Sequence, residues 1–214
     1  FETTTPTVAA AILTAAQEGL QNFSVISSHK VMPPALEALL DDPDIQIDGL
    51  ICPGHVSIMI GADAYQPFVN KYKIPCVIAG FEPLDVMHSP LMLIRQVNEG
   101  RFEVENEYPR VVTPEGNDVA TGLMAEVIEL RRSFEWRGLG EVPYSALRIS
   151  GKYAEWDAEA RFEVTKSTGT DVKGCECPAI LRGRSEERRV GNGCGWRVGG
   201  GGFGGGGGGG GGGG

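Results

Sequence analysis

Apolar, strand-like runs alternate with helical patterns along the first half of the chain, and this alternation constrains the fold more than any other feature. Three runs, residues 23–27, 45–52 and 76–79, predict strands, and a segment with helical spacing of apolar residues follows each of them. Strands and helices that alternate in this way build βαβ units, whose strands are parallel. The sequence therefore predicts an α/β fold: a parallel sheet with helices on both faces, in a Rossmann-like three-layer sandwich.

Proline and glycine mark the expected helices. Thr5 as N-cap, Pro6 at the first helical position and Gly19 as a stop predict a helix over residues 5–20. The segment 134–162 is aromatic and rich in loops, and we expect it to pack over the body of the protein without a core of its own. Further helices are expected over residues 33–40, 65–72, 89–98 and 119–132.

One internal repeat predicts a duplication. Residues 1–4 lead into a helix that ends at Gly19, and residues 81–85 lead into a second helix that ends at Gly100. A short run that begins with Phe and continues toward Val follows each helix, at residues 23–25 and 102–104. The repeat predicts a pseudo-two-fold pair of α/β domains, with residues 1–22 as the remnant of the first and 23–133 as the second.

The glycine content changes abruptly near the C-terminal end. Of the 32 glycines, 18 lie between Gly191 and Gly214, and a glycine homopolymer buries no apolar surface. Residues 184–191 also look like the codon-for-codon translation of a common sequencing adapter. We therefore expect residues 184–214 to be an artefactual, disordered tail, the alternative being a basic linker. Phe1 stands where an initiator Met would, so we also expect the natural sequence to begin earlier.

Charge and cysteine content limit the partners of the chain. Without the tail, 15 Lys and Arg face 26 Asp and Glu, and the formal net charge moves from −9 to −11. This acidity argues against a nucleic-acid partner, because phosphate contacts need clustered cations. No apolar run approaches the roughly 20 residues that span a bilayer. With no visible signal peptide, and with Cys52 and Cys76 inside apolar runs as expected of buried thiols, we predict a cytoplasmic protein without a membrane partner.

Polar and glycine-rich loops follow the predicted strands. In open parallel sheets, function collects at the carboxyl ends of the strands, where the loops form a crevice. Residues 1–4, 52–57 and 80–85 have this position. The candidate cleft residues are Phe1, Glu2, Thr3, Thr4, Pro53, Gly54, His55, Val56, Ser57, Gly80, Phe81, Glu82, Pro83 and Asp85.

The titratable groups in these loops each have a structural alternative. His55 could act as acid, base, ligand or hydrogen-bond donor, or could simply bind the backbone. Glu82 and Asp85 are three residues apart and could serve chemistry or cap a helix. Glu2 has the same ambiguity. For the isolated His29 and His88 we favour structural roles.

Cys175 and Cys177 form a Cys-x-Cys pair near the end of the credible sequence. A structural zinc or iron–sulfur centre normally takes four ligands, so this pair gives only a weak metal candidate. Cys194 lies in the expected tail and is set aside. The sequence holds no G-x-G-x-x-G after a strand, no P-loop and no nucleophile elbow, which removes support from cofactor-driven redox chemistry and nucleotide hydrolysis.

Taken together, the three loops resemble signature motifs of the HypD family of nickel–iron hydrogenase maturation proteins. The motifs are Phe1-Glu2-Thr3-Thr4, Pro53-Gly54-His55-Val56-Ser57 with Gly61 after it, and Gly80-Phe81-Glu82-Pro83-Leu84-Asp85. The similarity continues through residues 103–106, 136–140 and 162 to Cys175-Glu176-Cys177 and Leu181-Arg182-Gly183. It covers essentially all of residues 1–183.

The resemblance implies a cytoplasmic scaffold that assembles the Fe(CN)2CO group together with a HypC-type chaperone and a HypE-type cyanide donor. It implies two related α/β domains, a redox function in the full-length protein, and iron with a 4Fe–4S cluster as cofactors. Residues 134–183 would lead to the iron–sulfur domain. The iron-binding and redox cysteines would precede Phe1, and the cluster cysteines would lie mostly beyond Gly183. This segment by itself is then expected to be inactive, and its loops would shape the cleft that faces the iron.

The residues alone leave two other functions open. One is an α/β enzyme that acts on a small molecule, with His55 and Glu82 as acid and base. The other is a non-catalytic protein-interaction module. A turnover that needs no partner protein and is lost in His55→Ala would favour the enzyme.

Overall fold

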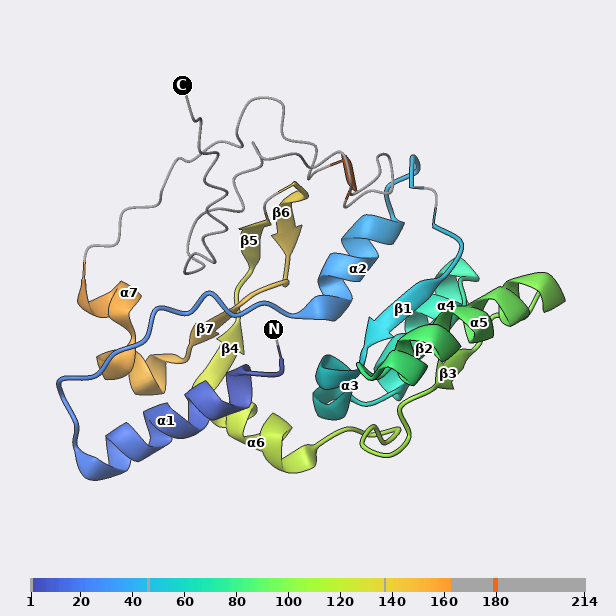
Figure 1. The fold of residues 1–214 in the computed structure, drawn as a ribbon. Helices are drawn as coiled ribbons and strands as arrows, with labels where there is room; N and C mark the ends of the chain where they lie inside the picture. Colours follow the sequence, from blue (N-terminus) through green and yellow to red (C-terminus); the bar gives the residue numbers. More distant parts are fainter. Residues whose placement is uncertain (1, 46, 137, 163–178, 181–214) are drawn as a thin grey trace, which may run out of the picture.

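A computed structural model describes residues 2–45, 47–136, 138–162 and 179–180, and its described part contains two hydrophobic cores joined side by side (Figure 1). The expected tail, 184–214, lies outside the described residues, and so do Phe1, Cys175 and Cys177. Among the described helices, none is long and apolar enough to cross a membrane.

The first core is built around a three-stranded parallel sheet, as the sequence predicted. Its strands are β1 (Leu50–Pro53), β2 (Cys76–Ala79) and β3 (Val104–Asn106), in the order β1-β2-β3. Leu50 pairs with Cys76, and Cys76 pairs with Val104. All three strands run in the same direction, so their carboxyl ends meet at one edge of the sheet.

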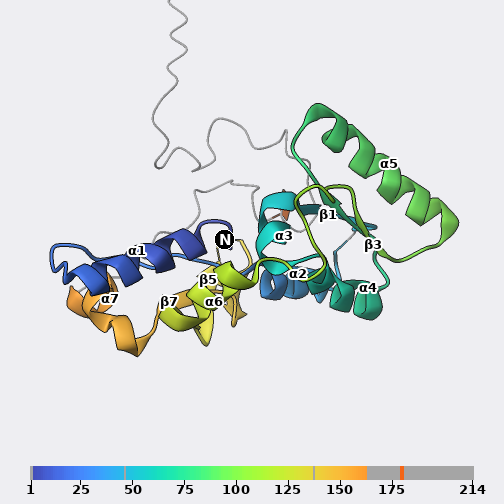
Figure 2. The same ribbon diagram turned by 90° about the horizontal axis from the view of Figure 1, so that it is seen from below.

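Helices pack on this sheet from two sides (Figure 2). Apolar residues of α2 (Met32–Leu40) and α4 (Gln66–Tyr72) share one core with alternate residues of β1 and β2. α5 (Pro83–Glu99) packs against β1 and β2 from the other side. Successive strand side chains point to opposite faces, which is why one short strand can serve both layers. The core residues contributed by the two strands on the α2 and α4 side are Leu50, Cys52, Cys76 and Ile78.

The second core joins the two ends of the described chain. α1 (Thr5–Glu18) packs on α6 (Asp118–Val127) and on the antiparallel pair of β4 (Ile128–Leu130) and β7 (Leu147–Ile149). Tyr153 and Trp156 of the 3₁₀ segment η2 (Gly151–Trp156) lie in the same core. Residues 134–162 therefore pack over α1 and α6 and share this core with them, as expected of a segment without a core of its own. The domain limits at residues 22 and 133 stay a prediction.

The remaining elements are short. β5 (Ser133–Trp136) and β6 (Gly140–Pro143) form an antiparallel pair, and α7 (Ala158–Arg161) follows η2. α3 (Gly54–Ile60) follows β1 directly, and η1 (Asp63–Tyr65) precedes α4.

Two expected strands differ from the observed ones. Residues 23–27 form no strand; Val25 makes one isolated bridge to Asp157, since the chain on either side of Asp157 is helical. The strand expected over residues 45–52 begins only at Leu50. The Leu50 amide donates to the Pro75 carbonyl, and Pro75 has no N–H to extend the ladder further.

Two expected helices also differ. The helix expected over residues 119–132 ends at Val127, because Ile128 and its neighbours pair with β7 instead. The helix expected at residue 89 begins at Pro83, and Pro90 lies inside it. At α1, Thr4 takes the N-cap position and Thr5 is the first helical residue, while Gly19 ends the helix in a left-handed conformation as expected.

Candidate functional site

The candidate site lies at the edge of the sheet where the three parallel strands end. β1 runs directly into α3, so residues 54–57, expected as a loop, are the first turns of a helix. β2 is followed by Gly80 and Phe81, which lead into α5. β3 is followed by Glu107, Tyr108 and the segment that carries Arg110. The structure thus brings two of the three predicted loops together and adds a third segment, residues 107–110, that the sequence analysis did not single out.

Two glycines allow these segments to approach closely. A Cβ atom on Gly54 would lie 2.5 Å from the Ala79 carbonyl oxygen and 2.7 Å from Cδ1 of Tyr108. A Cβ atom on Gly80 would lie 2.7 Å from Cδ2 of the same ring and still closer to the Asp85 carboxylate. Real Cβ atoms do not approach other atoms this closely, so glycine is required at both positions. The ring of Tyr108 fills the space between the β1 and β2 ends.

His55 and Phe81 form the exposed rim of the site. Their ring centroids are 4.1 Å apart with a tilt of 32° between the planes. Phe81 also lines a hollow of about 250 Å³ at the ends of β1 and β2, with Pro53, Ala79 and Gly80. The imidazole is thus positioned by an aromatic contact beside a small apolar hollow, while Val56 of the same turn is buried.

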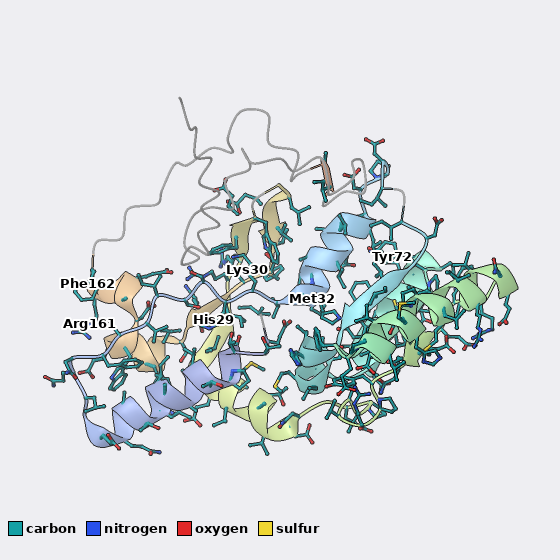
Figure 3. All side chains as sticks on the ribbon, viewed as in Figure 1. His29, Lys30, Met32, Tyr72, Arg161 and Phe162 are labelled. Carbon is teal, nitrogen blue, oxygen red and sulfur yellow. The ribbon has the colours of Figure 1, made fainter. Side chains whose placement is uncertain are left out.

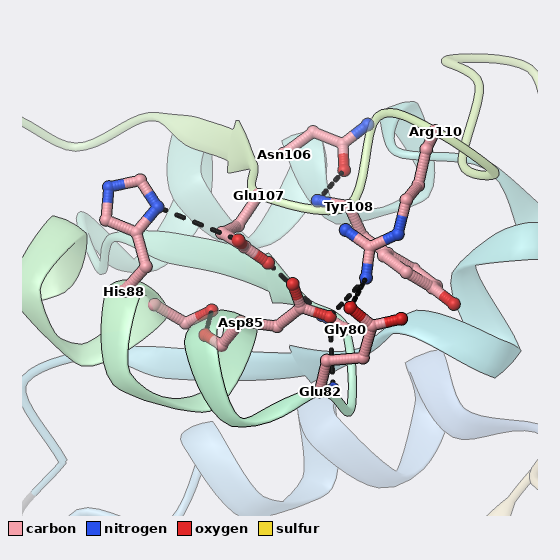
Figure 4. Close-up of polar contacts among 9 residues, drawn as sticks. Gly80, Glu82, Asp85, His88, Asn106, Glu107, Tyr108 and Arg110 are labelled. Atoms are coloured by element: carbon pink, nitrogen blue, oxygen red, sulfur yellow. Dashed lines mark hydrogen bonds and ion pairs between the residues drawn. The ribbon is translucent and has the colours of Figure 1, made fainter.

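The start of α5 is a network of carboxylates held by one guanidinium (Figure 4). Glu82 and Asp85 form a capping box, in which each side chain accepts a backbone N–H of the first turn. Arg110 Nη2 donates to Asp85 Oδ2 at 2.5 Å and lies 3.6 Å from Glu82 Oε2. The Arg110 guanidinium holds the pKa of Asp85 below its ordinary value, against a smaller opposing effect of burial. The capping interpretation of Glu82 and Asp85 is therefore confirmed.

Arg110 also covers the Tyr108 ring, with its Cζ atom 4.3 Å from the ring centroid. Glu107 extends the network on the other side, because its carboxylate accepts the Gly80 N–H and lies 3.7 Å from His88 Nδ1. His88 therefore has the structural contact that we favoured for it. His55 and Glu82 are joined by no hydrogen bond or ion pair among the described residues, so the structure gives no coupled acid–base pair.

Ser57 points into the protein. Its hydroxyl donates to the Pro53 carbonyl at 2.8 Å and lies 3.0 Å from the Tyr65 hydroxyl. Both side chains are fully buried. Burial is also the main cause that raises the pKa of Tyr65, which keeps the phenol neutral. Ser57 is thus a structural residue of the motif that ties α3 to the end of β1.

Glu2 is buried at the start of α2. Its side chain is 2% exposed, and Oε1 accepts the backbone N–H of Met32, the first residue of α2. Figure 3 labels Met32 at the start of that helix. Because Pro33 and Pro34 follow Met32 and have no N–H, this bond satisfies the one free amide of that helical turn. Burial raises the pKa of Glu2, opposed by the hydrogen bond from Met32. Thr3 and Thr4 continue from Glu2 into α1. Glu2 is near enough to Tyr65 for its charge to help raise the pKa of that phenol, after the larger effects of burial and Cys52.

The described residues contain two free cysteines, Cys52 and Cys76, which are both buried in the sheet core as expected. The hydrogen bond that the Cys52 thiol donates to Cys76, together with burial, raises the pKa of Cys52, so that thiol is neutral. Within the described ranges, no three His, Cys, Asp or Glu side chains come together in a way that could hold a metal ion.

Tyr108, Arg110, Glu107 and Tyr65 are the site residues that sequence reasoning missed. Three of them follow β3, a strand of three residues with one apolar side chain, Val104, whose pattern is too short to predict from sequence. If β3 had been predicted, their position directly after a strand would have made them candidate site residues. Tyr65 gave no local signal, because its hydroxyl partner is eight positions away.

A short parallel α/β sheet with glycine-constrained segments at its carboxyl edge defines the class of protein. Comparison with known proteins gives the family. The HypD model, described as the hydrogenase formation hypA family, matches residues 1–191. The chain belongs to the HypD family. The match runs past Gly183, where we placed the start of the tail, and that limit stays a prediction.

Several curated relatives are similar over most of the chain. The hydrogenase maturation factor HypD of Azotobacter vinelandii is 52% identical over 202 residues, which are 91% of this chain and 53% of the relative. That of Cupriavidus necator is 53% identical over 189 residues, 86% of this chain and 50% of the relative. That of Rhodobacter capsulatus is 47% identical over 201 residues, 91% of this chain and 53% of the relative. The chain therefore spans about half the length of the relatives it matches.

Proposed function

We propose that the chain is the central part of a cytoplasmic scaffold on which the Fe(CN)2CO group of nickel–iron hydrogenases is assembled. The observation that carries this proposal is the HypD family match, whose motif residues form the packed strand-end site around Tyr108. The partners would be a HypC-type chaperone and a HypE-type cyanide donor. In the full-length protein we also propose a Rossmann-like sandwich, paired with a second α/β domain by a pseudo-two-fold axis.

The strand-end site is suited to holding a cargo rather than to turning over a substrate. Its exposed side chains include an imidazole and an aromatic ring beside a small apolar hollow, and its carboxylates, the exposed Glu82 and the buried Asp85, are engaged by Arg110. An imidazole can donate a hydrogen bond to a bound ligand without chemical change. We propose that His55 and Phe81 contact the cargo from this side and that the carboxylates fix the shape of the site.

The iron–sulfur cluster and iron ligands of the proposal are not supplied by the described residues. Cys52 and Cys76 are buried in the sheet core and have no third ligand residue beside them. Cys175 and Cys177 lie outside the described residues. We therefore assign no redox step to the residues described, and the redox part of the proposal rests on family membership alone.

The test is maturation in a bacterium whose own HypD gene has been deleted. A full-length gene that carries this segment is expected to restore nickel–iron hydrogenase activity. The double variant His55→Ala, Phe81→Ala of the same gene is expected to give at least tenfold less hydrogenase activity. The purified scaffold should lose the infrared bands of bound cyanide and carbon monoxide in the same variant. His29→Gln, in the other half of the molecule, is the matched histidine control.

Each alternative outcome has a distinct meaning. Unchanged activity and unchanged infrared bands in the double variant would remove the strand-end site from the proposal. A full-length gene that restores nothing, although its protein is folded and abundant, would contradict the scaffold function itself. A turnover of a small molecule without partner proteins, lost in His55→Ala, would establish the enzyme alternative.

A further inference from the structure

α5 buries polar side chains against the sheet, with Leu93 packed beside Gly49 and Pro75, and leaves most of its apolar side chains exposed. The buried residues of this helix are Asp85, Ser89 and Gln96. Leu84 and Met87 are 82% and 74% exposed, and Leu91 and Ile94 are exposed as well. A surface helix in a soluble protein normally has the reverse arrangement, with an apolar stripe that faces the core. The exposed residues therefore need an explanation other than the packing of α5 on the sheet.

Hydrogen bonds fix the rotation of α5. Gln96 Nε2 donates to Glu105 Oε2 at 2.7 Å, and Gln96 Oε1 accepts the Glu103 N–H at 3.0 Å. At the other end, Asp85 is held by Arg110 and by the Glu82 N–H. Turning the helix to bury its apolar side would leave these polar groups unpaired, at a large cost. The outward apolar face is thus locked in place.

Four of the six exposed apolar residues of α5 form a straight stripe, and Val86 and Val97 lie outside it. Leu84, Met87, Leu91 and Ile94 are spaced by three, four and three positions, so at 3.6 residues per turn they fall within an arc of about 80°. The stripe runs for roughly 15 Å along the helix axis. This spacing is the one by which one helix packs along another, with alternate residues inserted between those of the partner. The stripe therefore fits a helix better than it fits a loop or a flat sheet.

One cation beside the stripe indicates the charge of the partner. Arg95 projects next to Ile94 and Leu91 on the helix surface, and it makes no ion pair with any residue of the described ranges. Glu99, the carboxylate nearest to it along that flank, is engaged by Arg101 at 2.7 Å. In a protein with a formal net charge of −9, an unengaged arginine beside an apolar stripe is complementary to a carboxylate on the partner.

We propose that the outward face of α5, defined by Leu84, Met87, Leu91, Ile94 and Arg95, binds an amphipathic helix of a separate protein that carries acidic residues beside its apolar stripe. A second copy of this chain fits less well, because it would bring another Arg95 and no free carboxylate to the same flank. The face begins next to Phe81, so the bound helix would end beside the strand-end site. The inference does not depend on the iron chemistry proposed above.

The test uses the purified chain and two synthetic amphipathic helices. Each peptide has Leu at the first and fourth positions (a and d) of every heptad, and the residues that flank this apolar stripe are Glu in one peptide and Lys in the other. At low salt the Glu peptide is expected to bind at least tenfold more tightly than the Lys peptide, measured by fluorescence anisotropy. The double variant Leu84→Ser, Met87→Ser should bind the Glu peptide at least tenfold more weakly. Arg95→Glu should make the chain bind the Lys peptide more tightly than the Glu peptide. Val119→Ser, which removes an equally exposed apolar residue from α6, is the matched control.

Three results would overturn the inference. The first is that neither peptide binds, or that both bind equally and the variants change nothing while circular dichroism shows each variant folded. The second is a dimer of the chain in light scattering that Met87→Ser dissolves, which would make a second copy the occupant. The third is protection of Met87→Cys from maleimide in the full-length protein without partners while Val119→Cys reacts, which would place another part of the same protein on α5.

Discussion

At the scale of single residues, the strand-end site depends on glycines rather than on reactive groups. Gly54 and Gly80 lie against opposite edges of the Tyr108 ring, and no larger residue fits at either position without moving backbone or ring atoms. The hydroxyl of the motif residue Ser57 is hydrogen-bonded to the Pro53 carbonyl and the Tyr65 hydroxyl. The part of the Pro53–Ser57 motif that is open to a ligand is therefore small, and its exposed titratable side chain is His55.

Gly54→Ala should destabilise the protein by about 1–3 kcal/mol, because the new Cβ would overlap a backbone oxygen that cannot move away. Urea unfolding monitored by circular dichroism measures this change. Gly122→Ala in α6 is the control, since no atom lies within 4 Å of its Cβ position. In that helical interior alanine is expected to stabilise by about 0.5–1 kcal/mol. Equal effects of the two substitutions would contradict the packing argument.

Glu2 should make stability fall as the pH rises. Burial raises its pKa in the folded state above the ordinary value of 4.5, so the folded protein binds this proton more tightly than the unfolded chain does. Ionising the buried Glu2 therefore destabilises the folded protein. This destabilisation is absent below the ordinary pKa, grows as the pH rises toward the folded-state pKa, and is constant above it. Each unit of pKa difference corresponds to about 1.4 kcal/mol.

Glu2→Gln keeps an oxygen for the Met32 N–H but cannot ionise, and it provides the reference. The free energy of unfolding of the wild type, relative to this variant, should decrease between pH 4.5 and pH 7 in urea titrations. A difference that is flat or that increases over this range would show that the hydrogen bond and the positive end of α2 outweigh burial.

At the scale of elements, α5 departs most from what the sequence pattern predicted for its start and its buried side. It starts with a proline and a capping box, carries Pro90 in its interior, and buries polar residues. The sequence pattern placed its start at Ser89-Pro90, because proline favours first-turn positions. The observed start is at Pro83, where Glu82, Asp85 and Arg110 satisfy the first turn from outside the helix. The helix then continues through Pro90 to Glu99.

Pro90→Ala should stabilise the protein, by up to about 3 kcal/mol, since alanine restores a backbone N–H and removes the clash of the ring with the preceding turn. The urea midpoint and the free energy of unfolding measure the gain. Pro83→Ala is the matched control, because a proline at the first helical position costs little and its replacement should change stability only slightly. A loss of stability in Pro90→Ala would mean that the proline shapes the contact of α5 with the sheet.

At the scale of the whole molecule, the two cores combine segments distant in sequence. α1 packs against α6 and against residues 128–156, and the sheet lies between α5 on one side and α2 with α4 on the other. A pocket of about 430 Å³ opens between the two regions, lined by residues of both, among them Glu2, Ile60, Met124 and Leu147. The two regions are therefore less tightly packed against each other than each is within itself.

Ile12→Ala should lower the free energy of unfolding by about 2–5 kcal/mol, because Ile12 is fully buried in the α1 core. Local opening follows the cooperative unit that is weakened. Amide hydrogen exchange should therefore accelerate in α1, α6 and η2 more than in β2. Ile78→Ala, in the sheet core, is the matched variant and should show the reverse pattern. Uniform acceleration in both variants would show that the two cores open as one unit.

The sequence by itself determined the parallel α/β sheet, α1, α2 and α4, the two site loops after β1 and β2, and the HypD resemblance. These features rest on local signals: apolar periodicity, prolines and glycines at element ends, and contiguous motifs. Tertiary structure alone decided the third site segment at Tyr108 and Arg110, the role of Glu2 at α2, and the core built on α1. Each of these depends on groups that meet across 25 to more than 100 positions, such as Asp85 with Arg110 or Leu20 with Trp156. No local pattern encodes such contacts, because packing and hydrogen-bond satisfaction choose among the many pairings that the sequence permits.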